Sequence, residues 1–158
     1  MKKKKVIFIS STGGHLSELM VLKPIFNDYD YHIITEKTES TISLKNEFGK
    51  RMHYLIYGTR INRFKYVCKV TCNTIKSLGL FFKIRPKAIV TTGTHTAMPM
   101  CIIAKIFGAK VIFIETFANV YTPTGSGKFL YKIVDKFVIQ WEELKEVYPD
   151  AVYLGGIF

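Results

Sequence analysis

Short apolar runs alternate along the chain with segments of helical periodicity, and this pattern constrains the fold more than any other feature. The runs, such as residues 6–9 (VIFI) and 111–114 (VIFI), are apolar at every position rather than at every second one. A strand of this kind is buried on both faces, as in a parallel sheet covered by helices on each side. The alternation therefore predicts a Rossmann-like, doubly wound, mostly parallel α/β fold.

The expected elements follow one another without a linker or a repeat, so residues 1–158 are predicted to form a single domain. Strands are expected at 5–9, 31–35, 52–56, 87–91, 110–115, 136–140 and 151–154. Helices are expected at 16–26, 61–83, 96–107, 126–133 and 142–147.

The charge and the hydropathy of the chain indicate which partners it binds and where in the cell it is located. The chain carries 23 Lys and Arg against 12 Asp and Glu, a net charge of +11, which indicates an anionic partner such as a membrane surface, nucleic acid or a phosphorylated substrate. No stretch reaches the roughly 18 apolar residues of a spanning helix, so we expect a cytoplasmic protein with peripheral membrane contact at most. The three cysteines, Cys68, Cys72 and Cys101, are expected to be reduced, buried apolar residues.

The segment 10–15 (SSTGGH) lies between the first strand and its helix, at the sheet edge where ligands bind in such folds. Gly13 and Gly14 permit a tight turn, and the N–H groups at the helix start suit a phosphate. With Thr12, they form a candidate acceptor-phosphate site, and His15 is a candidate general base or hydrogen-bond donor. The alternative is a plain tight turn with a capping histidine.

A second loop, 91–99 (TTGTHTAMP), follows the fourth expected strand. Thr92, Gly93 and Thr94 are expected to line the same crevice and to contact sugar hydroxyls, unless the threonines only cap the next helix.

A third loop begins at Glu115, at the end of the fifth expected strand, and continues to Asn119. The Glu115 carboxylate and the Asn119 amide are candidates for binding a sugar or steadying the first loop, and Glu115 is the alternative catalytic base. The other interpretation is a glutamate held by a nearby lysine or helix start. Because strand ends share one edge, the three loops should converge on one crevice.

No cofactor or metal is expected. Residues 125–128 (GSGK) resemble part of a P-loop, but Thr122 and Phe129 stand where that motif needs Gly and Ser or Thr. No set of Cys and His has zinc-site spacing.

Residues 61–83 form a long amphipathic pattern, with apolar residues on one helical face and lysines beside them. Each basic residue near an anionic leaflet contributes about 1 kcal/mol, so this helix is a candidate membrane-binding element. The alternative is a helix whose apolar face packs on the sheet. The residues predicted to contact the membrane are Arg63, Lys65, Lys69, Lys76, Phe82 and Lys83.

Three blocks of sequence resemble a known family: residues 11–15 (STGGH), residues 91–93 (TTG) with Pro99, and a tail from 111–118 (VIFIETFA) through 140–143 (QWEE) to 155–158 (GGIF). The chain resembles bacterial capsule and exopolysaccharide proteins related to the membrane-anchor subunit of the two-chain N-acetylglucosaminyltransferase of dolichol-linked chitobiose synthesis. The Gly-Gly-His segment is shared more loosely with the peptidoglycan glycosyltransferase MurG. The resemblance extends over residues 6–158.

This resemblance implies the N-terminal half of a GT-B glycosyltransferase that is split over two chains. The chain would bind a lipid-linked, undecaprenyl-diphosphate type acceptor and the inner face of the cell membrane, and a separate chain would bind the nucleotide-sugar donor. Trp141, Ile157 and Phe158, together with Tyr148, are candidate contacts with that partner, or else core residues.

Two other functions compete with this one. A non-catalytic membrane scaffold that recruits the catalytic subunit is equally compatible with the sequence. A nucleic-acid-binding module is disfavoured, because no RRM, KH or helix-turn-helix signature is present and the lysines lie beside an apolar stripe.

Overall fold

The apolar runs form one parallel sheet, as predicted. In the computed structural model, which describes residues 3–58 and 63–157 without the side chains of 63–65, the sheet has seven strands in the order β3-β2-β1-β4-β5-β6-β7. Each neighbouring pair is parallel. The strands are β1 Lys5–Ile9, β2 Asp30–Lys37, β3 Met52–Ile56, β4 Ala88–Thr91, β5 Lys110–Ile114, β6 Lys136–Ile139 and β7 Val152–Tyr153.

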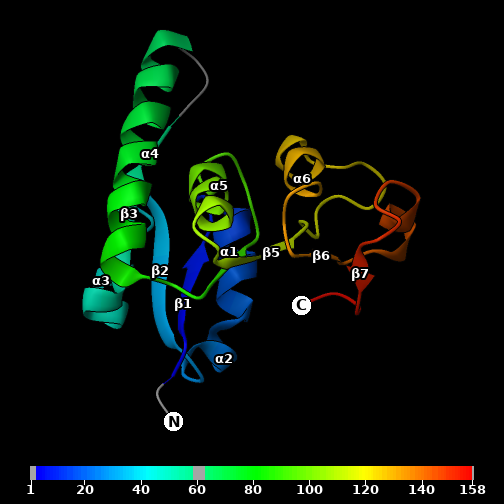
Figure 1. Ribbon diagram of the computed structural model, residues 1–158, viewed down its shortest axis with the longest axis horizontal. Helices are drawn as coiled ribbons and strands as arrows, with labels where there is room; N and C mark the ends of the chain where they lie inside the picture. Colours follow the sequence, from blue (N-terminus) through cyan, green and yellow to red (C-terminus); the bar gives the residue numbers. More distant parts are fainter. Residues whose placement is uncertain (1–2, 59–62, 158) are drawn as a thin grey trace.

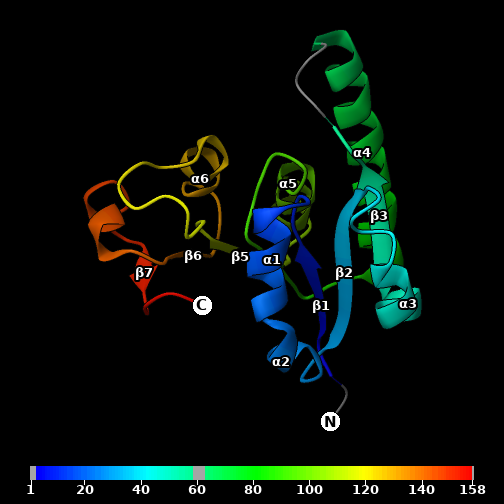
Figure 2. The ribbon, with the colours of Figure 1, turned by 180° about the vertical axis from the view of Figure 1, so that it is seen from behind.

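The central strands are buried on both faces, which explains why their sequences do not alternate. Val6 and Phe8 of β1 enter one hydrophobic core, whereas Ile7 and Ile9 enter the other. Figures 1 and 2 show the corresponding layers, with α4 and α5 over one face and α1 over the other. The helical segments are α1 Gly14–Val21, α2 Lys23–Phe26, α3 Leu44–Phe48, η1 Gly49–Arg51, α4 Arg63–Ile84, α5 Met98–Ile106, α6 Gly125–Leu130 and η2 Glu142–Glu146.

The first predicted helix, 16–26, is two helices, α1 and α2, and α1 already begins at Gly14. The chain breaks at Leu22 because Pro24 has no N–H to continue the α1 hydrogen-bond ladder. The short helix α3 and the turn η1 were not predicted from the sequence. Their core contact is the buried Phe48, and such short segments leave little periodicity to detect.

The helix α4 ends where the sequence predicts, before Pro86, with Arg85 in the left-handed conformation at φ 56°. The face that it turns toward the core is not the predicted apolar stripe. Figure 1 shows α4 at one side of the sheet, with its first turns projecting beyond the strands. The residues that it buries are Asn73, Ser77, Phe81 and Ile84.

The apolar stripe predicted on α4 points away from the sheet. Val67 is 61% exposed and Ile75 is 66% exposed, and Leu78 and Phe82 are also exposed. Phe82 continues this surface onto the end of α5, because its ring lies 4.8 Å from that of Phe107. The alternative in which this stripe packs on the sheet is therefore wrong for the described part of α4.

The prediction of three buried cysteines holds only for Cys101, whose burial raises the pKa of its thiol to about 12. Cys68 and Cys72 are exposed on α4. Within the described residues, no helix is long and apolar enough to cross a membrane.

Candidate functional site

The three predicted loops meet at the carboxyl edge of the sheet. The chain leaves β1 through Ser10, and Gly13 then takes φ 80° at the start of α1, a conformation that glycine adopts without strain. Gly13 and Gly14 are exposed, so this helix start is open to a ligand. Its free N–H groups and the helix dipole favour an anion.

His15, the predicted base, is fixed against the second loop. Its Nδ1 lies 2.8 Å from the backbone carbonyl oxygen of Thr92, and the Thr92 hydroxyl donates to the carbonyl of His15 at 2.6 Å. Because a carbonyl oxygen can only accept, Nδ1 carries the proton and the lone pair of the neutral ring is on Nε2. The ring is half-buried, so its orientation is set before any substrate arrives.

The second loop is joined to the first by further contacts. The Ser11 N–H donates to the carbonyl of Gly93 at 3.0 Å, and the Thr94 hydroxyl donates to the Ser11 hydroxyl at 3.2 Å. Gly93 has φ 98°, and a Cβ added there would lie 3.6 Å from Nδ1 of His15. The first two predicted loops thus form one connected polar cluster that contains Ser11, Thr92, Gly93 and Thr94.

The carboxylate that steadies this cluster is Glu36, at the end of β2, and not Glu115. Glu36 is buried and accepts hydrogen bonds from the N–H of Thr12 at 3.2 Å and from the Thr96 hydroxyl at 2.7 Å. Sequence reasoning missed it, although it follows the apolar run of β2 as Glu115 follows that of β5. The same strand-end rule would have found it.

A second missed carboxylate, Glu18 of α1, ties the first loop region to the third. It is buried, and its Oε1 accepts from the Thr116 hydroxyl at 2.6 Å and from the N–H of Phe117 at 3.0 Å. Its position one helical turn after His15 was the available signal.

Glu115 is only 1% exposed, and both of its oxygens are engaged. They accept from the Thr116 N–H, from the Thr124 N–H and hydroxyl, and from the Tyr148 hydroxyl. Burial, followed by the neighbouring Glu115 charge, raises the pKa of Tyr148 far above its usual range. Glu115 therefore orders the loop after β5 and the start of α6, where Thr124 caps the helix.

The predicted partner contacts are largely internal. Tyr148 is buried in the core. The indole N–H of Trp141 donates to the carbonyl of Phe117 at 2.7 Å, and the N–H of Ile157 donates to the Gln140 side chain at 3.0 Å. Trp141 and Ile157 are half-buried, so each keeps only part of its surface for a partner.

The remaining predicted site residues do not share one location in the structure. Asn119 is half-buried and closes a turn through its N–H to the Thr116 carbonyl. The side chains of Arg63 and Lys65, and the whole of Phe158, lie outside what the structure describes. Lys69, Lys76 and Lys83 are on α4, to one side of its outward apolar stripe.

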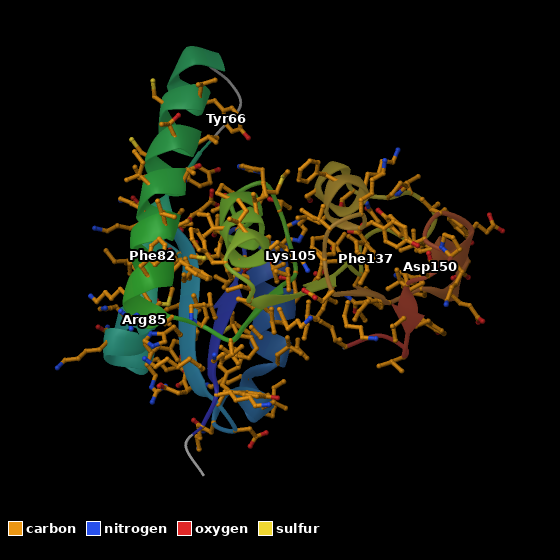
Figure 3. All side chains as sticks on the ribbon, viewed as in Figure 1. Tyr66, Phe82, Arg85, Lys105, Phe137 and Asp150 are labelled. Carbon is orange, nitrogen blue, oxygen red and sulfur yellow. The ribbon has the colours of Figure 1, made fainter. Side chains whose placement is uncertain are left out.

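An apolar groove runs from the polar cluster along the junction of α4 and α5. It has a volume of about 610 Å³, and its walls include Tyr66, Val70, Met98 and Ile102. His95 joins the groove to the second loop, since its Nδ1 lies 3.2 Å from the Thr94 hydroxyl and its ring is 5.7 Å from that of Tyr66. In Figure 3, the Tyr66 side chain projects from α4 on the side of α5.

The arrangement of the sheet and its helices is found in other solved structures. The chain matches MurG of Acinetobacter baumannii with a TM-score of 0.72 and 16% identity, over 89% of this chain and 42% of that one. It matches a Staphylococcus aureus MnaA structure with a TM-score of 0.74 and 10% identity, over 98% of this chain and 45% of that one. This chain spans less than half the length of either protein. At these identities the likeness establishes the fold alone, that of the N-terminal half of a GT-B glycosyltransferase.

Sequence comparison identifies the family. Residues 5–157 match the family described as "Oligosaccharide biosynthesis protein Alg14 like", and the chain belongs to that family. Relatives named UDP-N-acetylglucosamine transferase subunit ALG14 are 28% identical in Homo sapiens, over 96% of this chain and 82% of the relative, and 36% identical in Schizosaccharomyces pombe, over the same shares. These relatives are eukaryotic, and they lend no support to the expected capsule or exopolysaccharide setting.

Proposed function

We propose that this chain is the acceptor- and membrane-binding subunit of a two-chain glycosyltransferase. A separate chain binds the nucleotide-sugar donor, and this chain presents a lipid-linked, prenyl-diphosphate type acceptor at the inner face of a membrane. The observation that carries the proposal is the His15 ring, which is held through Nδ1 on the Thr92 carbonyl beside an open, glycine-rich helix start. The subunit names of the relatives support the division between two chains.

In the proposed reaction, the acceptor hydroxyl oxygen attacks the anomeric carbon of the donor sugar. The bond from that carbon to the diphosphate oxygen breaks, and the nucleoside diphosphate leaves with the electron pair. Nε2 of His15 takes the hydroxyl proton, because Nδ1 is already committed to the Thr92 carbonyl. The N–H groups at Gly13 and Gly14 face the acceptor's diphosphate, with Thr12 and Thr94 beside them.

Glu115 does not act as the base in this scheme, because its carboxylate is buried and fully engaged. It keeps the third loop, including Asn119, in place for the sugar. Glu36 and Glu18 are the corresponding positioning residues for the first two loops.

Membrane contact is assigned to α4 and the end of α5. The exposed apolar side chains of Val67, Ile75 and Phe82 face away from the sheet, and Lys76 and Lys83 lie to one side of them. Apolar side chains next to cations are typical of a surface that dips into an anionic leaflet. The neighbouring groove between α4 and α5 fits the first isoprene units of the acceptor.

The activity is tested with this chain alone, the donor-binding chain alone, and both together, using a panel of nucleotide sugars and lipid-linked acceptors. Activity that needs both chains supports the proposal and names the sugar. Full activity from the partner alone would reduce this chain to a scaffold. Bacterial acceptors on undecaprenyl diphosphate belong in the panel, because capsule or exopolysaccharide synthesis is the finer part of the proposal.

Two substitutions at His15 separate a base from an orienting group. His15→Asn keeps an N–H donor for the Thr92 carbonyl but has no basic lone pair, whereas His15→Ala removes both. If His15 is the base, both variants lose about 100-fold or more in kcat of the reconstituted pair. If Asn restores activity, His15 orients the acceptor, and unchanged activity in both variants favours the scaffold.

Membrane binding is tested by flotation with anionic vesicles. Val67→Ser with Ile75→Ser should weaken flotation, because these side chains are 61% and 66% exposed on the proposed surface. The matched control is Ile25→Ser with Leu154→Ser, which changes side chains that are 43% and 83% exposed away from α4 and α5. Equal losses in the two pairs would contradict the assignment.

A further inference from the structure

Two histidines form a pair at the amino edge of the sheet, the edge opposite to the proposed active site. Nδ1 of His32 on β2 lies 3.0 Å from Nε2 of His53 on β3. The two side chains share a face because His53 pairs with Ile34, two residues after His32. Ile34 packs in the core beneath α4 and α5, so the histidines open on the same side.

Lysines surround this pair. A cavity of about 460 Å³, the basic basin, is lined by His32, His53, Lys5, Lys45, Lys50 and Lys83, together with Ile84. These residues come from β1, β2, α3, η1, β3 and α4, so the cluster exists only in the folded chain. Figures 1 and 2 place the end of α4 beside α3, and Figure 3 labels Arg85, which directly follows that end.

The positive charge of the basin is uncompensated. None of the described residues that line it is acidic, and among the described ion pairs none involves Lys5, Lys50 or Lys83. Asp30 is near His32, but it is paired with Arg51 at 3.3 Å. The end of α4 adds only about half a negative charge.

The histidines respond to this environment. Burial, followed by the charges of His32, Lys45 and Lys83, lowers the pKa of His53 to about 4. Burial also lowers the pKa of His32, with Arg51, Lys5 and Lys83 acting in the same direction and Asp30 against it. Cations gathered in a hollow repel one another, and a bound anion removes that repulsion.

We propose that the basic basin binds a phosphate-type anion, a phosphomonoester or diphosphate group. The ammonium groups of Lys5, Lys50 and Lys83 supply charge, and the outward ring nitrogens, Nε2 of His32 and Nδ1 of His53, supply donors. The cavity is larger than one phosphate, so the group can carry a substituent. A second hollow of about 530 Å³ shares Lys45 and His53 and extends along β3 past Lys37 and Lys76.

Anion binding is coupled to the uptake of a proton by the pair of His32 and His53. In the neutral pair, one ring nitrogen must accept from the other ring, and protonation of the pair turns a further ring nitrogen into a donor. An anion in the basin raises the pKa of both histidines from their lowered values, so affinity should rise as the pH falls from about 7 to about 5, toward the pKa of His53 in the free protein. Sulfate is the probe for this step, because its own charge stays constant over that range.

The first test measures pyrophosphate binding by calorimetry on the full chain. Lys5→Gln with Lys50→Gln should weaken binding about tenfold, because two close positive charges are lost. Lys132→Gln with Lys145→Gln, two exposed lysines remote from the basin, gives the same change in net charge and should leave the affinity unchanged. Equal weakening in both pairs, or no binding by the unaltered chain, overturns the proposal.

The source of the phosphate is decided with vesicles of phosphatidylcholine, with and without phosphatidic acid. If the ligand is a lipid headgroup, Lys5→Gln with Lys50→Gln reduces binding to the phosphatidic acid vesicles, and pyrophosphate competes. If the ligand is a free phosphate compound, pyrophosphate binds in solution, and Lys5→Gln with Lys50→Gln does not change binding to the vesicles. Either result supports the phosphate site.

The histidine pair is tested separately. His53→Gln should keep sulfate binding at about pH 7 but lose most of the tightening at about pH 5. An unchanged pH dependence, with no shift of the histidine NMR signals on adding sulfate, removes the histidines from the site. Failure of any of these tests leaves the proposed transferase function untouched, because Lys5, Lys50 and His53 lie at the edge opposite to His15 and outside the proposed membrane surface, with which the basin shares only Lys83.

Discussion

Gly127 lies against the buried cluster that holds the third loop of the site, and its replacement by alanine tests whether that cluster is as tight as the structure shows. A Cβ on Gly127 would meet Glu115 Oε2, and it would lie 2.7 Å from the Tyr148 hydroxyl and 2.8 Å from Oγ1 of Thr124. All three atoms are fixed by hydrogen bonds to one another, so the cluster cannot yield without losing some of them.

The expected cost is the sum of three contributions. Overpacking a well-packed interior costs about 1–3 kcal/mol. The loss of one hydrogen bond to the Glu115 carboxylate costs about 1.5–3 kcal/mol, and the better helix propensity of alanine returns about 1 kcal/mol. Gly127→Ala should therefore lower the free energy of unfolding by about 1.5–5 kcal/mol, a large part of the roughly 5–15 kcal/mol typical of a domain.

The assay is urea unfolding followed by circular dichroism, with Gly125→Ala as the control. Gly125 begins the same helix, and a Cβ there meets nothing within 4 Å, so its stability should change by no more than about 1 kcal/mol. If Gly127→Ala were as stable as Gly125→Ala, the Glu115 cluster would be looser than described. Glu115 would then not hold the third loop in place as a positioning residue.

Two further substitutions test the frame of the fold. Asn73→Ala should lower the free energy of unfolding by about 2–3 kcal/mol in urea titrations. The buried Asn73 amide accepts from the Ile56 N–H and donates to the Ile56 carbonyl, each at 2.8 Å, and so satisfies both backbone groups of this residue on the edge strand β3. A change below about 0.5 kcal/mol would show that water replaces it at little cost. Asp135→Asn should cost about 2 kcal/mol at neutral pH, because the carboxylate accepts from Lys105 and Lys110 at 2.8 and 2.9 Å. Although burial alone would raise the pKa of Asp135, these lysines and the Val111 N–H hold it well below its usual range. The stabilisation is therefore present above about pH 4 and lost as the pH falls below it, so the two proteins should converge in stability in acid.

The sequence alone predicted the sheet and the convergence of its edge loops, because both depend on local pattern. Runs such as 6–9 are apolar at every position only when both faces are covered, and strand ends bring loops to one edge whatever the details of packing. His15, Thr92 and Gly93 were accordingly expected in one crevice, and the structure joins them by direct contacts.

The tertiary structure alone decided what each polar side chain does at that edge. Glu36 and Glu115 occupy similar places in the sequence, at the end of an apolar strand, yet one braces the first loop and the other the third. Their partners, Thr96 and Tyr148, lie far along the chain, and local sequence does not specify such long-range contacts. The burial of Tyr148, which was also a candidate partner contact, has the same origin.

The sequence by itself determined that the chain builds a two-sided parallel sheet with a glycine-rich edge loop, and that its longest helix is amphipathic. Only the tertiary structure decided that the apolar stripe with Val67 and Ile75 faces outward, and that His32 and His53 meet among lysines from several elements. Periodicity shows that a helix has two faces, but not which of them the sheet covers. Here the sheet covers the face with Asn73, because the Asn73 amide forms hydrogen bonds with the backbone N–H and carbonyl of Ile56 on the edge strand β3.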